Sequence, residues 1–415
     1  MPTMNTIPIS SNVRNLPPSS TLAVSAKARE LKARGVDVIG FGTGEPDFDT
    51  PRHIVESLHQ SVDGGLTRYA PSPGSMDCRD RIASKLRDEN GIPVEGRDVV
   101  VTVGGKQAIY LAMSCLIEPG RGDEVLLVSP AWVSVPAIVG VCGGVPTEVS
   151  GTVETGWKIT PEQLEQAITP RTVAVMINSP SNPCGTVYSP DELQALAEVI
   201  ERHPGLTLLS DEIYEKLIYP EIDPDVRHFS IGSMPGMAQR TITVNGLSKA
   251  FAMTGWRIGY LATPAGEGAF AASAAKLHSQ MVSSIPAFCM PPIIEALDHG
   301  APEVERMRLS FAERGRLMFG LLDDIDGIRC VRPSGAFYCF PELSGCFGRT
   351  SPGGARIENA MDFCNALLEE ASVAVVPGTD FGPTAADCCR LSFAASEAEI
   401  TTGCTRLAEF VSSLT

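Results

Sequence analysis

Short apolar runs alternate with amphipathic segments between about residues 95 and 265. Several runs are apolar throughout rather than alternating, which is typical of strands covered on both faces of a sheet. The predicted strands are Val99–Val103, Glu124–Val128, Val173–Asn178, Leu206–Leu209, Thr241–Val244 and Ile258–Ala262. Helix starts fall between them at Thr160-Pro161-Glu162-Gln163 and Ser189-Pro190-Asp191-Glu192, each with a cap and a proline at the first helical position. This alternation predicts an α/β domain with a mostly parallel central sheet flanked by helices.

The pattern changes after about residue 285. A long helix, three short strands, a capping box at Ser396 and a Gly/Pro/Ser-rich surface loop over 341–356 indicate a smaller α+β domain. The helix is predicted at Pro302–Leu322 and the strands at Gly335–Phe340, Val373–Val376 and Arg390–Ala394. We therefore expect a large domain over 46–285, and a small domain that combines 1–45 with 286–415.

Composition narrows the class of protein. The chain has 415 residues and a net charge of -16, so it lacks the basic surface that nucleic acid requires. None of its 12 cysteines forms a Cys-x-x-Cys pair, so we expect no metal and reduced thiols in a cytoplasmic protein. The N-terminus lacks the apolar stretch of a signal peptide, and no 18-residue apolar run predicts a membrane span.

Lys249 is the most informative residue, because it lies among small and apolar residues just after a predicted strand. Desolvation lowers the pKa of a lysine and frees its lone pair to attack a carbonyl. Arg257, eight residues later, offers a fixed cation for a phosphate. An amine able to form a Schiff base, close to a phosphate-binding cation, points to pyridoxal 5'-phosphate (PLP).

Other polar residues follow the predicted strands, at the edge where open α/β sheets bind ligands. Gly104-Gly105-Lys106 opens a helix and suits a phosphate, although such glycines are often only a turn. Trp132 offers a ring that stacks on a planar cofactor, although aromatic residues commonly pack in a core.

Four further residues suit the other parts of such a cofactor and its substrate. The Asn182 amide is able to donate to a phenolate oxygen, and Tyr214 lies within reach of the same ring. Asp211 is suited to keeping a pyridine nitrogen protonated, although an aspartate after a strand also caps helices. Arg390 enters an apolar strand and suits bidentate capture of a carboxylate.

The ordered set of motifs resembles the fold type I, class I PLP-dependent aminotransferases over nearly the whole chain. The likeness is greatest to the prokaryotic-type aspartate aminotransferases, some of which also use prephenate. The matching stretches are Phe41–Pro51, Tyr69–Pro71, Val101–Ala108, Ala250–Tyr260 and Val375–Phe381.

The resemblance implies a role for each residue. Lys249 carries the cofactor and shuttles the substrate proton; Asp211 pairs with the pyridine nitrogen; Asn182 and Tyr214 bind the 3'-oxygen. The phosphate is bound by Gly104, Gly105, Lys106, Ser248 and Arg257, with Tyr69 from the second subunit of a homodimer that shares its active sites. The α-carboxylate is bound by Arg390 with Trp132, Asn182 and the Gly44 backbone.

The resemblance also implies ping-pong transfer of an amino group between an L-amino acid and a 2-oxo acid. Lys106 and Thr21 occupy positions associated with acidic substrates and prephenate, so aspartate or glutamate, with 2-oxoglutarate or oxaloacetate, is the favoured pair. Against this, 277–284 lacks the arginine of other aspartate aminotransferases, and Val135 and Cys184 replace a common tyrosine and threonine.

Four alternatives stay open at this point. One is an aminotransferase for aromatic or neutral amino acids, and another is β-lyase or decarboxylase chemistry on the same fold. A non-enzymatic PLP-binding regulator would need a basic DNA-binding domain, whereas only about forty residues precede Gly44. A structural protein with a decayed site conflicts with the presence of every cofactor residue.

Overall fold

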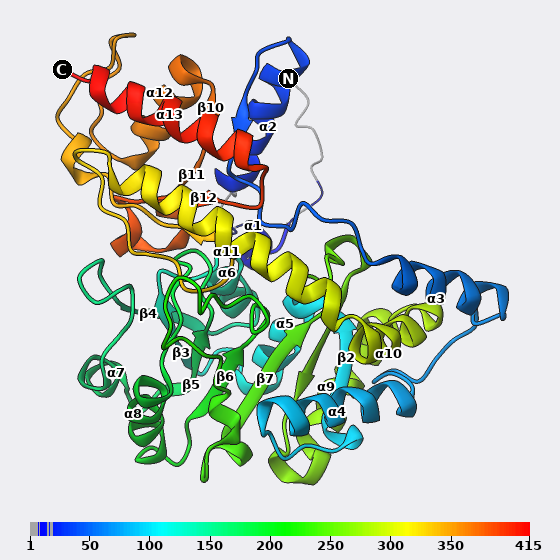
Figure 1. The fold of residues 1–415 in the computed structure, drawn as a ribbon. Coiled ribbons are helices and arrows are strands. Elements are labelled where there is room, and N and C mark those ends of the chain that lie inside the picture. Colours follow the sequence, from blue (N-terminus) through cyan, green and yellow to red (C-terminus); the bar gives the residue numbers. More distant parts are fainter. Residues whose placement is uncertain (1–6, 8, 15, 17–19) are drawn as a thin grey trace, which may run out of the picture.

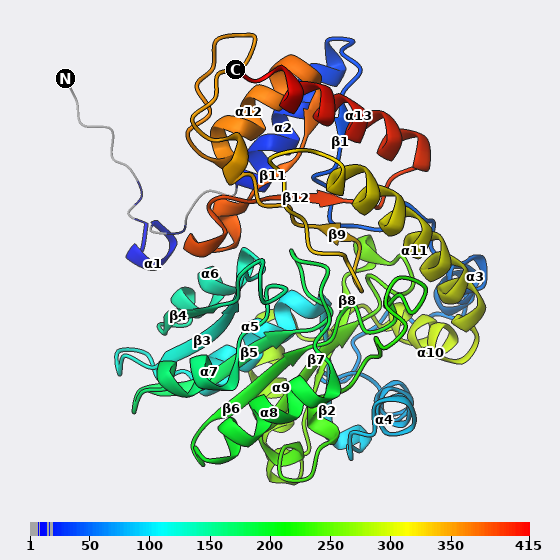
Figure 2. The ribbon, with the colours of Figure 1, turned by 60° about the vertical axis from the view of Figure 1, so that its left-hand side comes forward.

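The computed structural model describes residues 7, 9–14, 16 and 20–415, which form two layers (Figure 1). The lower layer in Figure 1 is built on a seven-stranded sheet, and the upper layer holds two small sheets with helices from both ends of the chain. The view turned by 60° in Figure 2 shows the same two layers. No helix within the described residues is both long and apolar enough to cross a membrane.

The large sheet has the strand order β2-β8-β7-β6-β5-β3-β4. Its strands are β2 (Val99–Val103), β3 (Glu124–Ser129), β4 (Val145–Ser150), β5 (Thr172–Asn178), β6 (Thr207–Asp211), β7 (Thr241–Gly246) and β8 (Ile258–Ala262). Only β8 runs antiparallel to its neighbours, so the carboxyl ends of the other strands lie along one edge. The predicted mostly parallel α/β sheet is confirmed.

All six predicted strands of this sheet are present, and one strand was not predicted. That strand is β4, which lies at the sheet edge and exposes Val145 and Pro146 to solvent. The sequence of β4, Val145-Pro146-Thr147-Glu148-Val149-Ser150, mixes polar with apolar residues and is partly exposed, so it lacks the apolar run by which the other strands, including β2 at the opposite edge, were recognised.

Helices cover both faces of the large sheet. They are α3 (Arg52–Asp63), α4 (Met76–Asn90), α5 (Gly104–Leu116), α6 (Ser134–Val141), α7 (Pro161–Ala167), α8 (Pro190–Glu201), α9 (Ala269–Val282) and α10 (Met290–His299). Apolar side chains of α5, α6 and α9 pack on one face, and those of α7 and α8 pack on the other. Each fully buried large aliphatic side chain contributes about 1.5–3 kcal/mol by leaving water. The two predicted capping boxes, at Thr160 and Ser189, begin α7 and α8.

The upper layer joins segments from both ends of the described chain. Its elements are α2 (Ser20–Ala33), β1 (Ile39–Gly40), α11 (Ala301–Asp323), β9 (Tyr338–Cys339), α12 (Ala360–Ala371), β10 (Val373–Ala374), β11 (Val376–Pro377), β12 (Cys389–Ser392) and α13 (Glu397–Ser413). The short helix α1 (Ser11–Arg14) instead lies beside α6 (Figure 2). Strand β1 pairs with β10, and β12 lies between β11 and β9. The predicted capping box at Ser396 begins α13.

Three features of the upper layer differ from the sequence prediction. Only Tyr338–Cys339 of the predicted 335–340 strand is a strand, and the predicted 373–376 strand is divided between β10 and β11. The 341–356 segment was predicted as a surface loop, but it buries Leu343, Cys346 and Ser351. Leu343 and Cys346 are isolated apolar residues in an irregular loop and produce no period, so the pattern along the chain does not indicate their burial.

The division into domains 46–285 and 1–45 with 286–415 stays a prediction. Helix α11 contributes Val304 to the core beneath β2 and β8, and Phe311 to the core of the upper layer. One helix therefore packs in both cores, and the two layers meet along it.

Candidate active site

A cavity of about 520 Å³ lies where the parallel strands of the large sheet end. The upper layer closes it with the segment Gly42–Glu45 and with Tyr338 and Arg390. The predicted site residues on its walls are Gly44, Gly105, Lys106, Trp132, Asn182, Asp211, Tyr214, Ser248, Lys249, Arg257 and Arg390. Residues from positions 44 to 390 of the sequence therefore meet in one pocket, as open α/β sheets commonly arrange.

Lys249 follows β7 and reaches into the pocket, where its Nζ donates a hydrogen bond to the Gly44 carbonyl. Burial, and then the charge of the nearby Arg390, lowers the pKa of Lys249 to about 8. The predicted desolvation of this amine is thus present, and a lysine with this pKa is in part a neutral nucleophile near pH 8.

The start of α5 forms an anion-binding end of the pocket. Gly104 has a φ of 76°, and a Cβ there would lie 2.6 Å from Arg257 Nη2. A Cβ on Gly259 would lie 2.4 Å from the Gly105 nitrogen, so both glycines let backbone approach closely. Burial, and then the charge of Arg257, lowers the pKa of Lys106. Two cations at a helix N-terminus suit a phosphate.

Asp211 is the last residue of β6, and Tyr214 follows in a turn rather than in the helix that an aspartate cap would imply. Burial raises the pKa of Asp211 to about 7. Asn178 fixes the strand end by donating from Nδ2 to the Asp211 carbonyl at 3.0 Å. A buried carboxylate without its own cation suits a positively charged ring nitrogen.

Arg390 lies on β12 at the opposite wall. Its Nη1 donates to Asn182 Oδ1 at 3.0 Å, and its Nη2 donates to the Gly42 carbonyl at 2.8 Å. The guanidinium lies between the rings of Tyr338 and Phe381, with its Cζ 4.6 and 5.2 Å from their centroids. The guanidinium is therefore oriented by neutral groups, and its charge is free for a carboxylate.

Some predicted residues lie outside the pocket of this chain. Gly104 does not line the pocket itself but lies against Arg257, which does. Tyr69 is 96% exposed on the surface. Thr21 belongs to α2, but its side chain lies outside the described residues. Val135 and Cys184, the two departures from the resemblance, are buried behind the pocket wall rather than on it.

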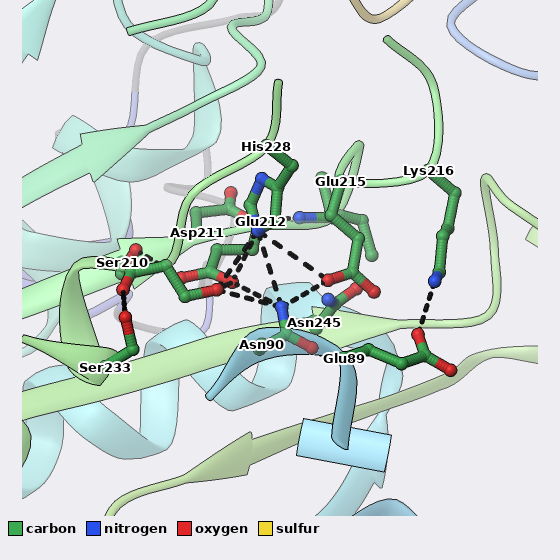
Figure 3. Close-up of polar contacts among 12 residues, drawn as sticks. Glu89, Asn90, Ser210, Asp211, Glu212, Glu215, Lys216, His228, Ser233 and Asn245 are labelled. Atoms are coloured by element: carbon green, nitrogen blue, oxygen red, sulfur yellow. Dashed lines mark hydrogen bonds and ion pairs between the residues drawn. The ribbon is translucent and has the colours of Figure 1, made fainter. Parts of the chain in front are cut away.

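Sequence reasoning missed a buried polar network behind Asp211 (Figure 3). Glu212 accepts hydrogen bonds from Ser210 at 2.9 Å, from Ser230 at 2.6 Å and from His228 at 3.1 Å. Asn90 Nδ2 donates to Glu215 at 2.7 Å. Asn90 lies 125 positions from Glu215, and His228 and Ser230 lie 16 and 18 positions from Glu212, so no short motif reveals the network.

The network also contains Lys85, which forms a buried ion pair with Glu215. Burial alone would raise the pKa of Glu215, but Lys85 and His228 lower it to about 2. Ligand atoms of Glu212, Glu215 and His228 lie within 4.8 Å of one another, a spacing that a metal ion would accept. Lys85 and Asn90 already pair with the carboxylates, and the expected absence of a metal stays a prediction.

Two other pocket residues were missed as functional candidates. Glu45 accepts a hydrogen bond from Thr254 at 2.7 Å and raises the pKa of Lys249 against the stronger lowering by burial. Tyr338 lies between Tyr214 and Arg390. Glu45 directly follows Gly42-Thr43-Gly44, and Tyr338 directly follows Gly335-Ala336-Phe337. Their position next to these motifs was the feature of the sequence that could have identified them.

The pocket fits an anionic cofactor that binds through an amine. Lys249, Arg257 and Arg390 donate hydrogen bonds to carbonyl or amide oxygens, and the Lys106 Nζ lies 4.9 Å from the centroid of the Trp132 ring. Arg390 Nε is buried with no partner among the described residues. Among the described residues, these four cations share the pocket with two carboxylates, those of Asp211 and Glu45. The excess positive charge accommodates a phosphate and a carboxylate together.

Comparison with known proteins identifies the family of this chain. Residues 36–407 match the family "Aminotransferase class I and II". The chain is 41% identical to the aspartate/prephenate aminotransferase of Cereibacter sphaeroides, over 98% of this chain and 99% of the relative. It is 43% identical to the aspartate aminotransferase of Geobacillus stearothermophilus, over 97% and 98%.

A solved structure is similar over the whole fold. The aspartate aminotransferase from Rhizobium meliloti superposes with a TM-score of 0.93 at 38% identity, covering 99% of this chain and 100% of that chain.

The chain belongs to the aminotransferase class I and II family and has the type I fold of PLP-dependent transferases. It is a PLP-dependent aminotransferase of the subgroup that contains the aspartate and aspartate/prephenate enzymes.

Proposed function

We propose that this aminotransferase transfers the amino group of aspartate or glutamate to 2-oxoglutarate or oxaloacetate, with prephenate as a further acceptor. The observation that carries the proposal is the position of Lys106, a second cation in the pocket beside Arg257 and apart from Arg390. A dicarboxylate has two charges to neutralise, and a neutral amino acid has one. The names of the relatives from Cereibacter and Geobacillus support the same substrates.

Different residues of the pocket would bind different parts of the cofactor. Gly105, Lys106, Ser248 and Arg257 line the pocket at the start of α5 and would hold the phosphate of PLP, with Gly104 shaping the turn. Asp211 would pair with the ring nitrogen, Trp132 would stack on the ring, and Asn182 and Tyr214 would bind its 3'-oxygen. When bound, PLP withdraws electrons from the substrate Cα and makes its C–H bond acidic.

Lys249 moves the proton in this proposal. Its amine takes the Cα proton of the amino acid and returns a proton to the cofactor, because a pKa of about 8 leaves it able to do both near neutral pH. Arg390, aided by Asn182, Trp132 and the Gly44 backbone, orients the α-carboxylate so that the Cα–H points to Lys249.

The enzyme is proposed to be a homodimer in the cytoplasm. Tyr69 is 96% exposed, on a segment that Ser72 links to α9 through a 3.1 Å hydrogen bond to the Ala275 carbonyl. Leu66, Met76, Met281 and Val282 are also exposed on this segment and on the end of α9. Exposed apolar residues beside a lone tyrosine favour a second copy as partner, with Tyr69 reaching its phosphate.

The experiment is single-turnover absorbance of the holoenzyme mixed separately with aspartate, glutamate, an aromatic amino acid and alanine. The expected result is rapid conversion of bound cofactor to its amino form by aspartate and glutamate. Lys106→Met removes a phosphate ligand for every donor, so it should slow alanine as well, but it should slow the dicarboxylates by about tenfold or more beyond the effect on alanine. Reaction of only aromatic or neutral donors would overturn the substrate, and oxo-acid release without the amino form would indicate a lyase or another PLP reaction.

The position of Thr21 is tested separately, with prephenate as the acceptor. Thr21→Val is expected to lower kcat/KM for prephenate more than for 2-oxoglutarate. Sedimentation of wild type and Tyr69→Phe is expected to give a dimer for both, with weaker cofactor binding in the variant. A monomeric, fully active wild type would refute the shared site.

A further inference from the structure

Tyr338 lies at the junction between the cofactor-facing and carboxylate-facing parts of the pocket. It begins β9, pairs with Ser392 on β12 and is fully buried. Its Oη lies 2.9 Å from Tyr214 Oη, and its ring centroid lies 4.6 Å from Arg390 Cζ. One side chain therefore contacts both a residue that faces the cofactor and the residue that binds the substrate carboxylate.

The two phenols share a hydrogen bond whose direction matters. Burial raises the pKa of both Tyr214 and Tyr338, so both carry their protons at neutral pH. Only one O–H can occupy the space between the two oxygens. When Tyr214 donates its O–H to an oxygen in the pocket, Tyr338 has to be the donor within the pair. A phenol that accepts a hydrogen bond is also a stronger donor to its next partner.

The surroundings of Tyr338 fix its hydroxyl in place. A Cβ on Gly44 would lie 3.1 Å from Tyr338 Oη and 3.9 Å from Arg390 Nη2. The ring packs edge to face against Tyr214, with centroids 5.9 Å apart. The glycine at position 44 thus leaves room for the hydroxyl, and the Tyr214 ring packs beside it.

We propose that Tyr338 is a positioning residue, which donates a hydrogen bond to Tyr214 so that the Tyr214 O–H points at the cofactor, and whose ring holds Arg390 for the α-carboxylate. This inference rests on the proposed function of the pocket. It concerns two separable parts of one side chain, the hydroxyl and the ring.

The hydroxyl is tested with Tyr338→Phe, which keeps the ring. The readout is the pH midpoint of the absorbance change of the bound cofactor, measured without substrate. Loss of the donor makes Tyr214 a weaker hydrogen-bond donor, so negative charge on the cofactor oxygen is less stabilised. The midpoint is expected to rise by about half a pH unit or more, with KM for the amino donor changed less than about threefold.

A double-mutant cycle assigns the effect to Tyr214. Tyr214→Phe should raise the midpoint by more, and Tyr338→Phe should add almost nothing in that background. Tyr219→Phe is the matched control, because Tyr219 is also fully buried and bonds the Ala336 carbonyl outside the pocket. It should leave the midpoint unchanged.

The role of the hydroxyl would be overturned by any of three results. The midpoint could be unchanged in Tyr338→Phe, it could shift equally in Tyr219→Phe, or Tyr338→Phe could shift it fully in the Tyr214→Phe background. These measurements need only bound cofactor, so they are distinct from a failure of transamination in the wild type.

The ring is tested with Tyr338→Leu, compared with Tyr338→Phe. Without the aromatic face, Arg390 loses one of its two flanking rings, and KM for the amino donor is expected to rise about threefold or more above that of Tyr338→Phe. Equal KM values in the two variants would overturn the role of the ring.

Discussion

The turn from Asp211 to Glu215 has two faces with opposite electrostatics. Asp211 and Tyr214 line the pocket, whereas Glu212 and Glu215 point into the network behind it (Figure 3). All four are buried. Yet the pKa of Asp211 is raised to about 7, mainly by burial, while Lys85 and His228 outweigh the burial of Glu215 and lower its pKa to about 2.

The difference shows how one short segment serves function and stability together. On the pocket side, ionisable groups are desolvated and left for a ligand to pair. On the far side, the carboxylates have their cation and hydrogen-bond donors within the protein. A buried charge without a partner, such as Asp211, lowers stability. The paired carboxylates of Glu212 and Glu215 hold in place the same turn of backbone that carries Asp211. The variants below test each side of this contrast.

The largest effect is expected on the pocket side, from Lys249→Ala. The variant loses the amine that carries the cofactor and moves the proton, so turnover should fall by about 10⁴-fold or more. The melting temperature of the cofactor-free protein should stay the same or rise, because a desolvated amine is removed. Steady-state kinetics and thermal melting measure the two quantities; a large loss of stability would contradict the assignment of Lys249 to function.

On the far side, Lys85→Met should destabilise the protein by about 3–5 kcal/mol, because it leaves Glu215 buried without its cation. Urea unfolding of the cofactor-free protein measures the loss. If the free energy of unfolding changed by less than about 1 kcal/mol, the network would not be the anchor of the turn.

The raised pKa of Asp211 predicts a pH-dependent cost. The unfolded chain releases this proton near pH 4 and the folded one near pH 7, so the free energy of unfolding decreases as pH rises through that interval. Asp211→Asn should remove this decrease. The free energy of unfolding of the variant minus that of the wild type should therefore be larger at pH 8 than at pH 4, by up to about 4 kcal/mol. Urea midpoints of the cofactor-free proteins measure it.

The matched control is Asp88→Asn, at an exposed position of α4, whose difference from wild type should not depend on pH. A wild-type stability that did not decrease relative to Asp211→Asn between these pH values would show that Asp211 ionises normally.

The smallest effect is expected for Lys216→Met. Lys216 also forms an ion pair, with Glu89, but both side chains are more than a third exposed, at 36% and 41%. Solvent screens such a pair, so the change in unfolding free energy should be about 0–1 kcal/mol. A loss as large as that of Lys85→Met would mean that burial does not separate the two ion pairs.

The sequence alone determined the class of fold and most of the pocket. Strands covered on both faces are largely apolar, so the buried strands were visible in the pattern, and the partly exposed edge strand β4 was not. Asp211 and Lys249 were visible because polar residues at or just after the ends of apolar strands lie at one edge of a parallel sheet, and Arg257 was visible as a cation eight residues after Lys249.

Only the tertiary structure decided which distant residues complete the site. Tyr338 reaches Tyr214 and Arg390 across the two layers, and Lys85 reaches Glu215 across 130 positions of sequence. Hydrogen bonds and desolvation depend on separations of a few ångströms, and no period or motif along the chain encodes those separations. The chemistry of this aminotransferase was therefore readable from its sequence, whereas the pairing that sets the charge of each buried group was not.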